Sequence, residues 1–281
     1  MRIRAPAKVN LSLRVVGKRR DGYHLIDTII APVSLYDEIE IARARPRAKL
    51  SVACDDPKVP SGEKNLAYKA AALLLGKDAA KYPVAIHIKK RIPAGAGLGG
   101  GSSDAAAVLV GLNRLLKLKK NRRQLLRLAA KIGADVPFFV LGRPARARGI
   151  GERLKPLKSA RRLWLVIAYP GFPVSTSWAY HSLSFKLTKN IVKTSLNRHV
   201  WPLRGSAIEL VNDLEMPVFR RYPKVARLKR KLAEAGAAGT LMSGSGSSVF
   251  GIFSSGDKAR KAFLCLQREN GVQAFLVRSL R

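Results

Sequence analysis

The sequence is poor in acidic residues and in long apolar runs. Asp and Glu together make up only 18 of its 281 residues, against 53 Lys and Arg, so the formal net charge is +35. No apolar run reaches the roughly 18 residues that a membrane-spanning helix needs, and the N-terminus carries no apolar signal-peptide segment. We therefore expect no membrane partner and, by default, a cytoplasmic protein.

Cysteine and histidine are also scarce. The two cysteines, Cys54 and Cys265, stand far apart without the spacing of metal ligands, and the four histidines show no such spacing either. We predict buried or incidental thiols rather than a disulfide, and no zinc site. Hydrophobic residues nevertheless make up 47% of the chain, which is enough for one large or two modest domains with packed cores.

The excess of basic residues bears on partners rather than on the fold. Residues 113–131 and 219–231 each hold many basic residues and no acidic ones, without the interleaved aromatic residues of single-strand nucleic-acid binders. We interpret both segments as solvated helix faces. They predict no specific nucleic-acid partner, but salt-sensitive, nonspecific binding of polyanions.

The apolar pattern predicts an α+β protein. In its first part we expect strands over 3–17, 25–35, 37–44 and 48–54, a helix over 65–77, a strand over 84–93, helices over 105–118 and 122–133, and an apolar strand over 134–142. In its second part we expect a strand over 163–170, helices over 175–183, 207–214 and 222–235, a glycine-containing hairpin over 236–255, and a final helix and strand. A junction near residue 150 is predicted to separate domains 1–150 and 151–281.

Residues 93–104, which read PAGAGLGGGSSD, place five glycines directly before a predicted helix. Glycine has no Cβ and tolerates positive φ, so its backbone N–H groups can approach a ligand closely. A helix N-terminus favours anions, through its unpaired N–H groups and its dipole. The stretch therefore predicts a phosphate cradle; a flexible linker is the alternative, but linkers are uncommon between a strand and a helix.

This glycine loop completes none of the better-known nucleotide motifs. Gly95, Gly97 and Gly100 match G-x-G-x-x-G, yet no Asp or Glu occurs from Ala105 to Ala134 to hold a ribose. No G-K-[ST] follows the loop, and the chain contains neither H-R-D nor D-F-G. The pattern thus excludes a Rossmann dinucleotide site, a Walker loop and a protein kinase.

Two acidic residues and one lysine are candidates for chemistry at such a cradle, since phosphoryl transfer needs an activated acceptor and compensated charge. For Asp104, in the helix after the loop, we expect a capping or metal-linked role rather than that of a base. For Asp135, after the helix-ending Gly133, a helix–loop cap and a functional carboxylate both stay open.

Lys8 is the only charge in the apolar alternation Ala5–Val9, and Asn10 should face the same side of that strand. A buried lysine is costly without a partner, so Lys8 either faces the surface or pairs with an acid such as Asp135. Such a pair would keep the carboxylate ionised and stabilise charge on an acceptor oxygen. The second glycine loop, 243–248, is either a strand-connecting turn or a further wall of the phosphate site.

Three stretches, PAKVN, PAGAGLGGGSSDAA and the late SGSGSSVFGIF, together resemble the GHMP small-molecule kinases over essentially the whole chain. Within that superfamily APAKVNLSL, RRDGYHLIDTI, SLYDEI, GADVPFF and PGFPVSTSWAY resemble the kinases that phosphorylate the 2-hydroxyl of 4-diphosphocytidyl-2-C-methyl-D-erythritol in non-mevalonate isoprenoid biosynthesis. The resemblance implies a two-domain GHMP kinase fold, with an N-terminal domain like ribosomal protein S5 domain 2 and a ferredoxin-like C-terminal domain. It also implies ATP as donor and a small-molecule acceptor that carries a cytidine diphosphate group.

The resemblance assigns catalytic and ATP-binding residues. Asp135 matches the catalytic base, and Lys8 the lysine that pairs with it and orients the acceptor hydroxyl. Mg²⁺ is expected with ATP, with Ser103 as a candidate ligand beside water and phosphate oxygens. The implied ATP-binding residues are Pro93, Gly95, Gly97, Leu98, Gly99, Gly100, Gly101, Ser102, Ser103, Gly244 and Gly246.

For the acceptor, the resemblance implies a substrate-site role for Asn10 and a cytosine-binding role for Tyr23 and His24. Tyr180 is the predicted opposing aromatic residue, with the nearby Trp178 as alternative, because a base gains stacking energy between two aromatic faces. Other GHMP kinases, of the homoserine or mevalonate type, and a basic nucleic-acid-binding protein on this scaffold are the alternative functions. The charge of +35 exceeds what the resemblance leads us to expect. A lineage of basic proteins, engineered surface charge and a second polyanion-binding role are its open explanations.

Overall fold

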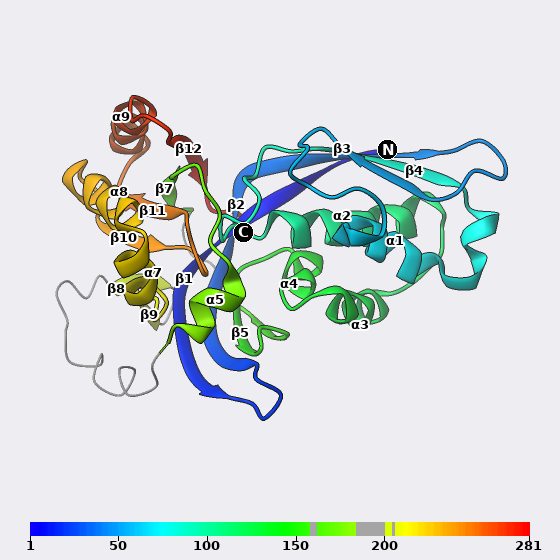
Figure 1. Cartoon of the computed structure of the whole chain (residues 1–281), viewed down its shortest axis with the longest axis horizontal. Helices are drawn as coiled ribbons and strands as arrows, with labels where there is room; N and C mark the ends of the chain where they lie inside the picture. The colour runs from blue at the N-terminus through cyan, green and yellow to red at the C-terminus, as the bar shows by residue number, and fades with distance from the viewer. Residues whose placement is uncertain (158–161, 184–199, 204–205) are drawn as a thin grey trace. The chain divides into compact units, whose positions relative to one another are not determined.

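The computed structural model describes residues 1–157, 162–183, 200–203 and 206–281 (Figure 1). The chain forms two compact units, each assembled from separate stretches of sequence. Unit 1 comprises Met1–Ala7, Leu35–Ala94 and Gly99–Gly142, and unit 2 comprises Lys8–Ser34, Gly95–Leu98 and Arg143–Arg281. The domain boundary near residue 150 stays a prediction.

Two long strands, β1 (Arg2–Lys18) and β2 (His24–Arg43), contribute residues to both units. The strands predicted over 25–35 and 37–44 are thus one continuous strand of 20 residues. Along β2, buried and half-buried side chains alternate on either side of a run of four buried residues, 30–33, and across this run the buried positions change from even- to odd-numbered residues. The alternation continues through Tyr36 and Asp37, which explains why the chain does not turn there.

In unit 1, β4 (Val84–Lys89) pairs in parallel with β3 (Ser51–Cys54) and antiparallel with the later part of β2. Val84, Ile86 and Ile88 are buried on one face of β4, which confirms the predicted alternation. The unit's helices are α1 (Leu66–Leu75), α2 (Gly100–Leu115), α3 (Arg122–Ile132) and α4 (Val136–Leu141), with the short 3₁₀ turns η1 (Gly62–Lys64) and η2 (Gly76–Lys81) beside α1. Alanines of α1 and α2 pack with the β4 residues in one core, so the helix that follows the glycine loop is anchored in the core of unit 1.

The segment after Asp135 is a helix, and the expectation of an apolar strand over 134–142 was wrong. Helix α4 has Pro137 in its first turn, where the fixed φ of proline suits a helix start. It ends at Gly142, which has a left-handed φ of 70° and donates its N–H to the Phe138 carbonyl. These two termini outweigh the strand preference of the apolar residues between them.

In unit 2, a four-stranded antiparallel sheet has the order β10 (Gly239–Met242), β11 (Val249–Phe253), β7 (Trp164–Tyr169) and β12 (Gln273–Arg278). Helices α8 (Pro223–Glu234) and α9 (Gly256–Gln267) pack on it through Leu228, Leu232 and Leu266. A second hairpin, β5 (Ala145–Gly149) and β6 (Arg153–Pro156), pairs with the first part of β2. Helix α5 (Thr176–His181) begins at the capping residue Ser175, and α7 (Glu215–Arg221) precedes α8.

The helix expected over 207–214 was also wrong. Residues Ser206–Glu209 form strand β9, which pairs with β8 (Val200–Leu203). The next residues pair with β1, because the N–H of Leu13 donates to the Val211 carbonyl and its carbonyl accepts from the N–H of Asp213. A helix over this segment would have to break both bonds.

The surface features that the composition predicted fit the described residues. Both cysteines are free, with Cys54 half-buried and Cys265 exposed. Arg122, Arg123 and Arg127 lie on the exposed face of α3, which confirms the solvated basic face predicted there. Among the placed helices, none combines the length and the apolar character needed to cross a membrane.

Candidate active site

The glycine loop adopts a conformation that requires glycine. Gly95, Gly97 and Gly99 have φ values of 64°, 76° and 72°, in the left-handed region that other residues rarely adopt. A Cβ on Gly97 would lie 2.1 Å from the carbonyl oxygen of Ser243, so any side chain there would clash with backbone. Helix α2 starts immediately after Gly99, as the phosphate-cradle prediction requires.

The second glycine loop packs directly on the first part of this loop within unit 2. It is the turn between β10 and β11, which confirms the strand-connecting alternative. The Ser243 hydroxyl donates to the Gly97 carbonyl at 2.9 Å, and the Ser248 N–H donates to the Ala96 carbonyl at 3.1 Å. The two loops therefore fix each other, and contact of Gly244 or Gly246 with phosphate stays a prediction.

Ser103 marks the helix end of the cradle. Its side chain is buried in the first turn of α2, and its hydroxyl oxygen has no hydrogen-bond partner within the ranges that the structure describes. Buried hydroxyl groups are normally hydrogen-bonded, so an unsatisfied one at a helix N-terminus is suited to a ligand. Among the residues that the structure describes, no group of three or more His, Cys, Asp or Glu could hold a metal ion.

Lys8 is buried, and the surface-facing alternative was wrong: only 4% of the residue is exposed. Its ammonium donates to Asn10 Oδ1 at 2.5 Å and to the Gly97 carbonyl at 2.7 Å, so Lys8 and Asn10 share one face as predicted. Asn10 in turn donates to the Thr28 hydroxyl. A Cβ on Gly244 would lie 3.0 Å from the ammonium, so glycine at that position gives Lys8 its room.

Asp135 stands at the N-cap position of α4, half-buried. Its side chain makes no capping hydrogen bond there, as far as the described chain shows, so the helix–loop cap was the wrong alternative. The carboxylate is held at the start of a helix that is buried through Val136, Pro137 and Phe138. Its pairing with Lys8 stays a prediction.

Two of the predicted cytosine-binding residues, His24 and Tyr180, contact each other. The rings of His24 and Tyr180 stack with centroids 5.3 Å apart and an interplanar angle of 29°. Trp178, the alternative to Tyr180, packs instead against Tyr222. Tyr23 is 61% exposed.

His24 has an environment that disfavours its charged form. Burial, Lys18 and His181 lower the pKa of His24 from its ordinary value of 6.5. The imidazole is therefore neutral at pH 7 and offers one donor and one acceptor nitrogen, which suits hydrogen bonding to the edge of a base.

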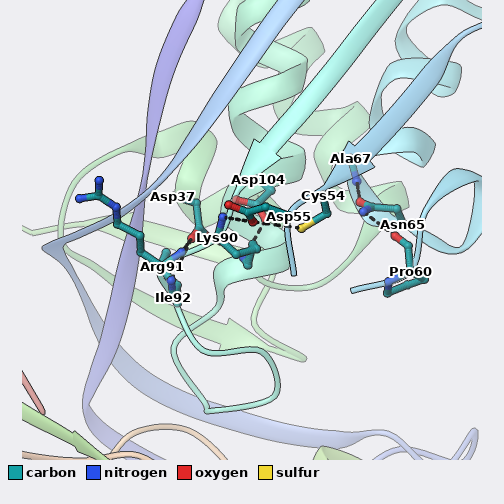
Figure 2. Close-up of polar contacts among 10 residues, drawn as sticks. All are labelled: Asp37, Cys54, Asp55, Pro60, Asn65, Ala67, Lys90, Arg91, Ile92 and Asp104. Atoms are coloured by element: carbon teal, nitrogen blue, oxygen red, sulfur yellow. Dashed lines mark hydrogen bonds and ion pairs between the residues drawn. The ribbon is translucent and has the colours of Figure 1, made fainter. Parts of the chain in front are cut away.

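Asp104 neither caps α2 nor acts alone. The N-cap residue of α2 is Gly99, and no side chain caps this end of the helix; Asp104 Oδ2 instead accepts a hydrogen bond from Lys90 Nζ at 2.9 Å (Figure 2). The capping role expected for Asp104 was therefore wrong. Sequence reasoning missed Lys90 altogether, because its partners Asp37 and Asp104 lie far from it along the chain and no spacing links the three.

Comparison with known proteins gives full-length matches. Models described as the GHMP kinases N terminal domain and the GHMP kinases C terminal match residues 65–143 and 191–273. A protein of Citrifermentans bemidjiense described as 4-diphosphocytidyl-2-C-methyl-D-erythritol kinase is 46% identical, over 100% of this chain and 99% of its own length. One with the same description from Syntrophotalea carbinolica is 42% identical, over 97% and 96%.

Solved structures agree with the sequence matches. The crystal structure of a 4-(cytidine 5'-diphospho)-2C-methyl-D-erythritol kinase matches with a TM-score of 0.81 and 38% identity, over 100% of both chains. A homoserine kinase from Cytophaga hutchinsonii matches with a TM-score of 0.71 and 19% identity, over 100% of this chain and 94% of that one, which is evidence for the fold alone.

Proposed function

The chain belongs to the 4-diphosphocytidyl-2-C-methyl-D-erythritol kinase family of the GHMP kinases, and we propose that it transfers the γ-phosphate of ATP to the 2-hydroxyl of that substrate. The observation that carries the proposal is 46% identity over the full length. The predicted two-domain α+β GHMP kinase fold is confirmed. The reaction makes the chain an ATP-dependent phosphotransferase with an alcohol acceptor, in isoprenoid precursor biosynthesis.

The triphosphate is bound by the glycine loop. Gly95, Gly97 and Gly99 bring backbone N–H groups to the phosphates, and the N-terminus of α2 adds its dipole. The buried, unsatisfied hydroxyl of Ser103 fits a phosphate oxygen or the Mg²⁺ that accompanies ATP. When bound, Mg²⁺ would neutralise phosphate charge, with Ser103, water and phosphate oxygens as its ligands.

Asp135 accepts the proton of the attacking 2-hydroxyl, and Lys8 stabilises the charge that develops on its oxygen. The support for Lys8 is that Asn10 and the Gly97 carbonyl fix its ammonium in a buried position, where a charge acts more strongly than in water. The support for Asp135 is its fixed place at the start of α4 with a carboxylate not used for capping. Most of the rate then comes from positioning and charge compensation.

The cytidine end of the substrate binds at Tyr23, His24 and Tyr180. The neutral imidazole of His24 can donate to and accept from the cytosine edge, while Tyr180 supplies an aromatic face. Asn10 contributes to the same substrate through its fixed amide.

The excess of basic residues predicts a second, weaker binding property. At a net charge of +35 the chain binds polyanions nonspecifically at low salt, with no specific nucleic-acid partner. Because the reaction consumes ATP, a cytoplasmic location is part of the proposal.

An acceptor panel tests the function. ADP release is followed at physiological salt with 4-diphosphocytidyl-2-C-methyl-D-erythritol, homoserine and mevalonate, and the phosphorylated product is located by ³¹P NMR. The proposal predicts turnover with the cytidine substrate only, and a phosphomonoester at its 2-position. Turnover with homoserine or mevalonate would identify a different GHMP kinase, and absence of turnover with all three would make the binding of nucleic acid the leading alternative.

A further inference from the structure

Unit 1 contains a buried ion cluster of Asp37, Lys90 and Asp104 (Figure 2). The ammonium of Lys90 is 2.5 Å from Asp37 Oδ2 and 2.9 Å from Asp104 Oδ2. The three side chains are 5%, 0% and 3% exposed, so the cluster is shielded from solvent. Burial of three charges is expensive, and apolar residues of similar volume are often at least as stable, so the cluster needs an explanation other than stability.

The cluster connects the two ends of the glycine loop. Lys90 directly follows β4 and precedes the loop, whereas Asp104 lies in α2, directly after it. A Cβ on Gly100, the first residue of α2, would lie 3.0 Å from Lys90 Nζ, so the lysine passes against the start of the helix. The Lys90–Asp104 pair therefore links the residue that follows the strand before the loop to the helix after it.

Carboxylates also hold the backbone of residues 90–92, which lead from β4 into the loop. Asp37 Oδ1 accepts the N–H groups of Arg91 at 2.6 Å and of Ile92 at 2.9 Å, while Asp55 Oδ1 accepts that of Lys90 at 2.8 Å. Three successive N–H groups are thus fixed by two side chains, and Asp37 serves both the backbone and the ammonium (Figure 2).

We propose that Lys90 is a positioning residue for the nucleotide, which holds the strand end and the helix start at the separation that the triphosphate requires by bridging Asp37 and Asp104. The inference rests on the proposed use of this loop for ATP. Loss of the bridge lets α2 and its N-terminal dipole shift relative to the loop, and the shift weakens ATP binding. The binding of the cytidine substrate is unaffected, since the cluster contacts none of its proposed residues.

The experiment compares Lys90→Met with Arg91→Met. Both remove one positive charge from adjacent positions. The Arg91 side chain, however, is 68% exposed, and its Nη2 lies 3.8 Å from Glu38 Oε1, at the long end of ion-pair distances. The dissociation constant of a non-hydrolysable ATP analogue is measured by calorimetry, and the KM values for both substrates by steady-state kinetics. We expect Lys90→Met to raise the nucleotide Kd by about 10- to 100-fold with an unchanged acceptor KM, and Arg91→Met to change neither by more than about twofold.

A second variant keeps the inference testable if Lys90→Met does not fold. Asp104→Asn preserves the shape of the side chain and still offers an oxygen to Lys90, so we expect a nucleotide Kd about 3- to 10-fold above that of the wild type. In the double variant the two effects should be strongly non-additive, because each change alone breaks the same bridge.

A wild-type nucleotide Kd in folded Lys90→Met, whatever its melting temperature, would overturn the inference and leave the cluster a purely structural feature. A wild-type Kd in Asp104→Asn would do the same if only that variant folds. These binding measurements use no acceptor. A wild type that binds the analogue but does not phosphorylate the cytidine substrate would therefore refute the proposed function alone, whereas a wild type that does not bind it would refute both.

Discussion

Lys8 and Lys90 are both buried lysines beside a glycine loop, but they donate to acceptors of different kinds. The Lys8 contacts described above are the neutral oxygens of Asn10 and Gly97, and those of Lys90 are the carboxylates of Asp37 and Asp104. The Gly97 contact holds Lys8 against the glycine loop, whereas the two carboxylates hold Lys90 beside the start of α2. This difference in place fits the roles proposed above, with Lys8 acting on the reacting atoms and Lys90 on the backbone around the loop.

The largest effect is expected on stability, at Lys90. Lys90→Met leaves the buried carboxylates of Asp37 and Asp104 without their counter-charge, so we expect a loss of about 3–5 kcal/mol. For a chain of this size that corresponds to a fall in melting temperature of roughly 6–20 °C, measured by thermal unfolding. Arg91→Met is the control, because its exposed pair contributes at most about 1 kcal/mol. Equal melting temperatures for the two variants would show that the buried bridge contributes no more to stability than the exposed Arg91 pair.

The next effect concerns turnover, at Lys8. In the proposed mechanism the Lys8 charge stabilises the acceptor oxygen only in the transition state, so Lys8→Met should lower kcat by about 10²- to 10³-fold. The nucleotide Kd should stay near that of the wild type, in contrast to Lys90→Met. Arg2→Met, an exposed change on the same strand, is the matched control. A Lys8→Met variant that loses nucleotide affinity but keeps its kcat would reverse the roles assigned to the two lysines.

A smaller effect is the pH dependence of stability, at Asp104. Burial, reinforced by Asp37 and opposed by Lys90, raises the pKa of Asp104 from 3.8 to about 7. Between these values the native state binds more protons than the unfolded state, so the contribution of this carboxyl to stability falls as pH rises from about 4 through about 7. Asp104→Asn should remove that slope, and Lys8→Met should keep it. Urea unfolding over this range measures both, and parallel curves for wild type and Asp104→Asn would contradict the assignment.

The smallest predicted effect separates two aromatic residues. Stacking on a base contributes about 1–3 kcal/mol, so Tyr180→Leu should raise the KM for the cytidine substrate by about 5- to 100-fold. Trp178→Leu should change it less, because Trp178 packs against Tyr222 rather than His24. A larger effect at Trp178 would return the cytosine contact to the alternative that the sequence left open.

The sequence predicted the features that depend on local chemistry. The five glycines of residues 93–104 were predicted to form a tight loop before a helix because glycine tolerates positive φ, and three of them, Gly95, Gly97 and Gly99, have positive φ. The shared face of Lys8 and Asn10 followed from the two-residue period of a strand. Both predictions needed only neighbouring residues.

The features that the sequence did not reveal depend on distant residues. The carboxylates that pair with Lys90 belong to Asp37 and Asp104, so only the folded chain shows that this lysine is buried. The helix over 136–141 was missed although Pro137 and Gly142 are typical of its two ends, because the apolar run between them also suits a strand. Likewise, the backbone of residues 211–213 pairs with Leu13, a contact that no local propensity encodes.

The role of Asp135 as base is tested most directly by Asp135→Asn in a single-turnover experiment. ATP and the cytidine substrate are both present at concentrations above their dissociation constants. The account predicts that the variant binds both substrates as the wild type does, and that phosphoryl transfer slows by about 10²- to 10⁴-fold. A variant that binds both and transfers phosphate at the wild-type rate would show that Asp135 is not the base.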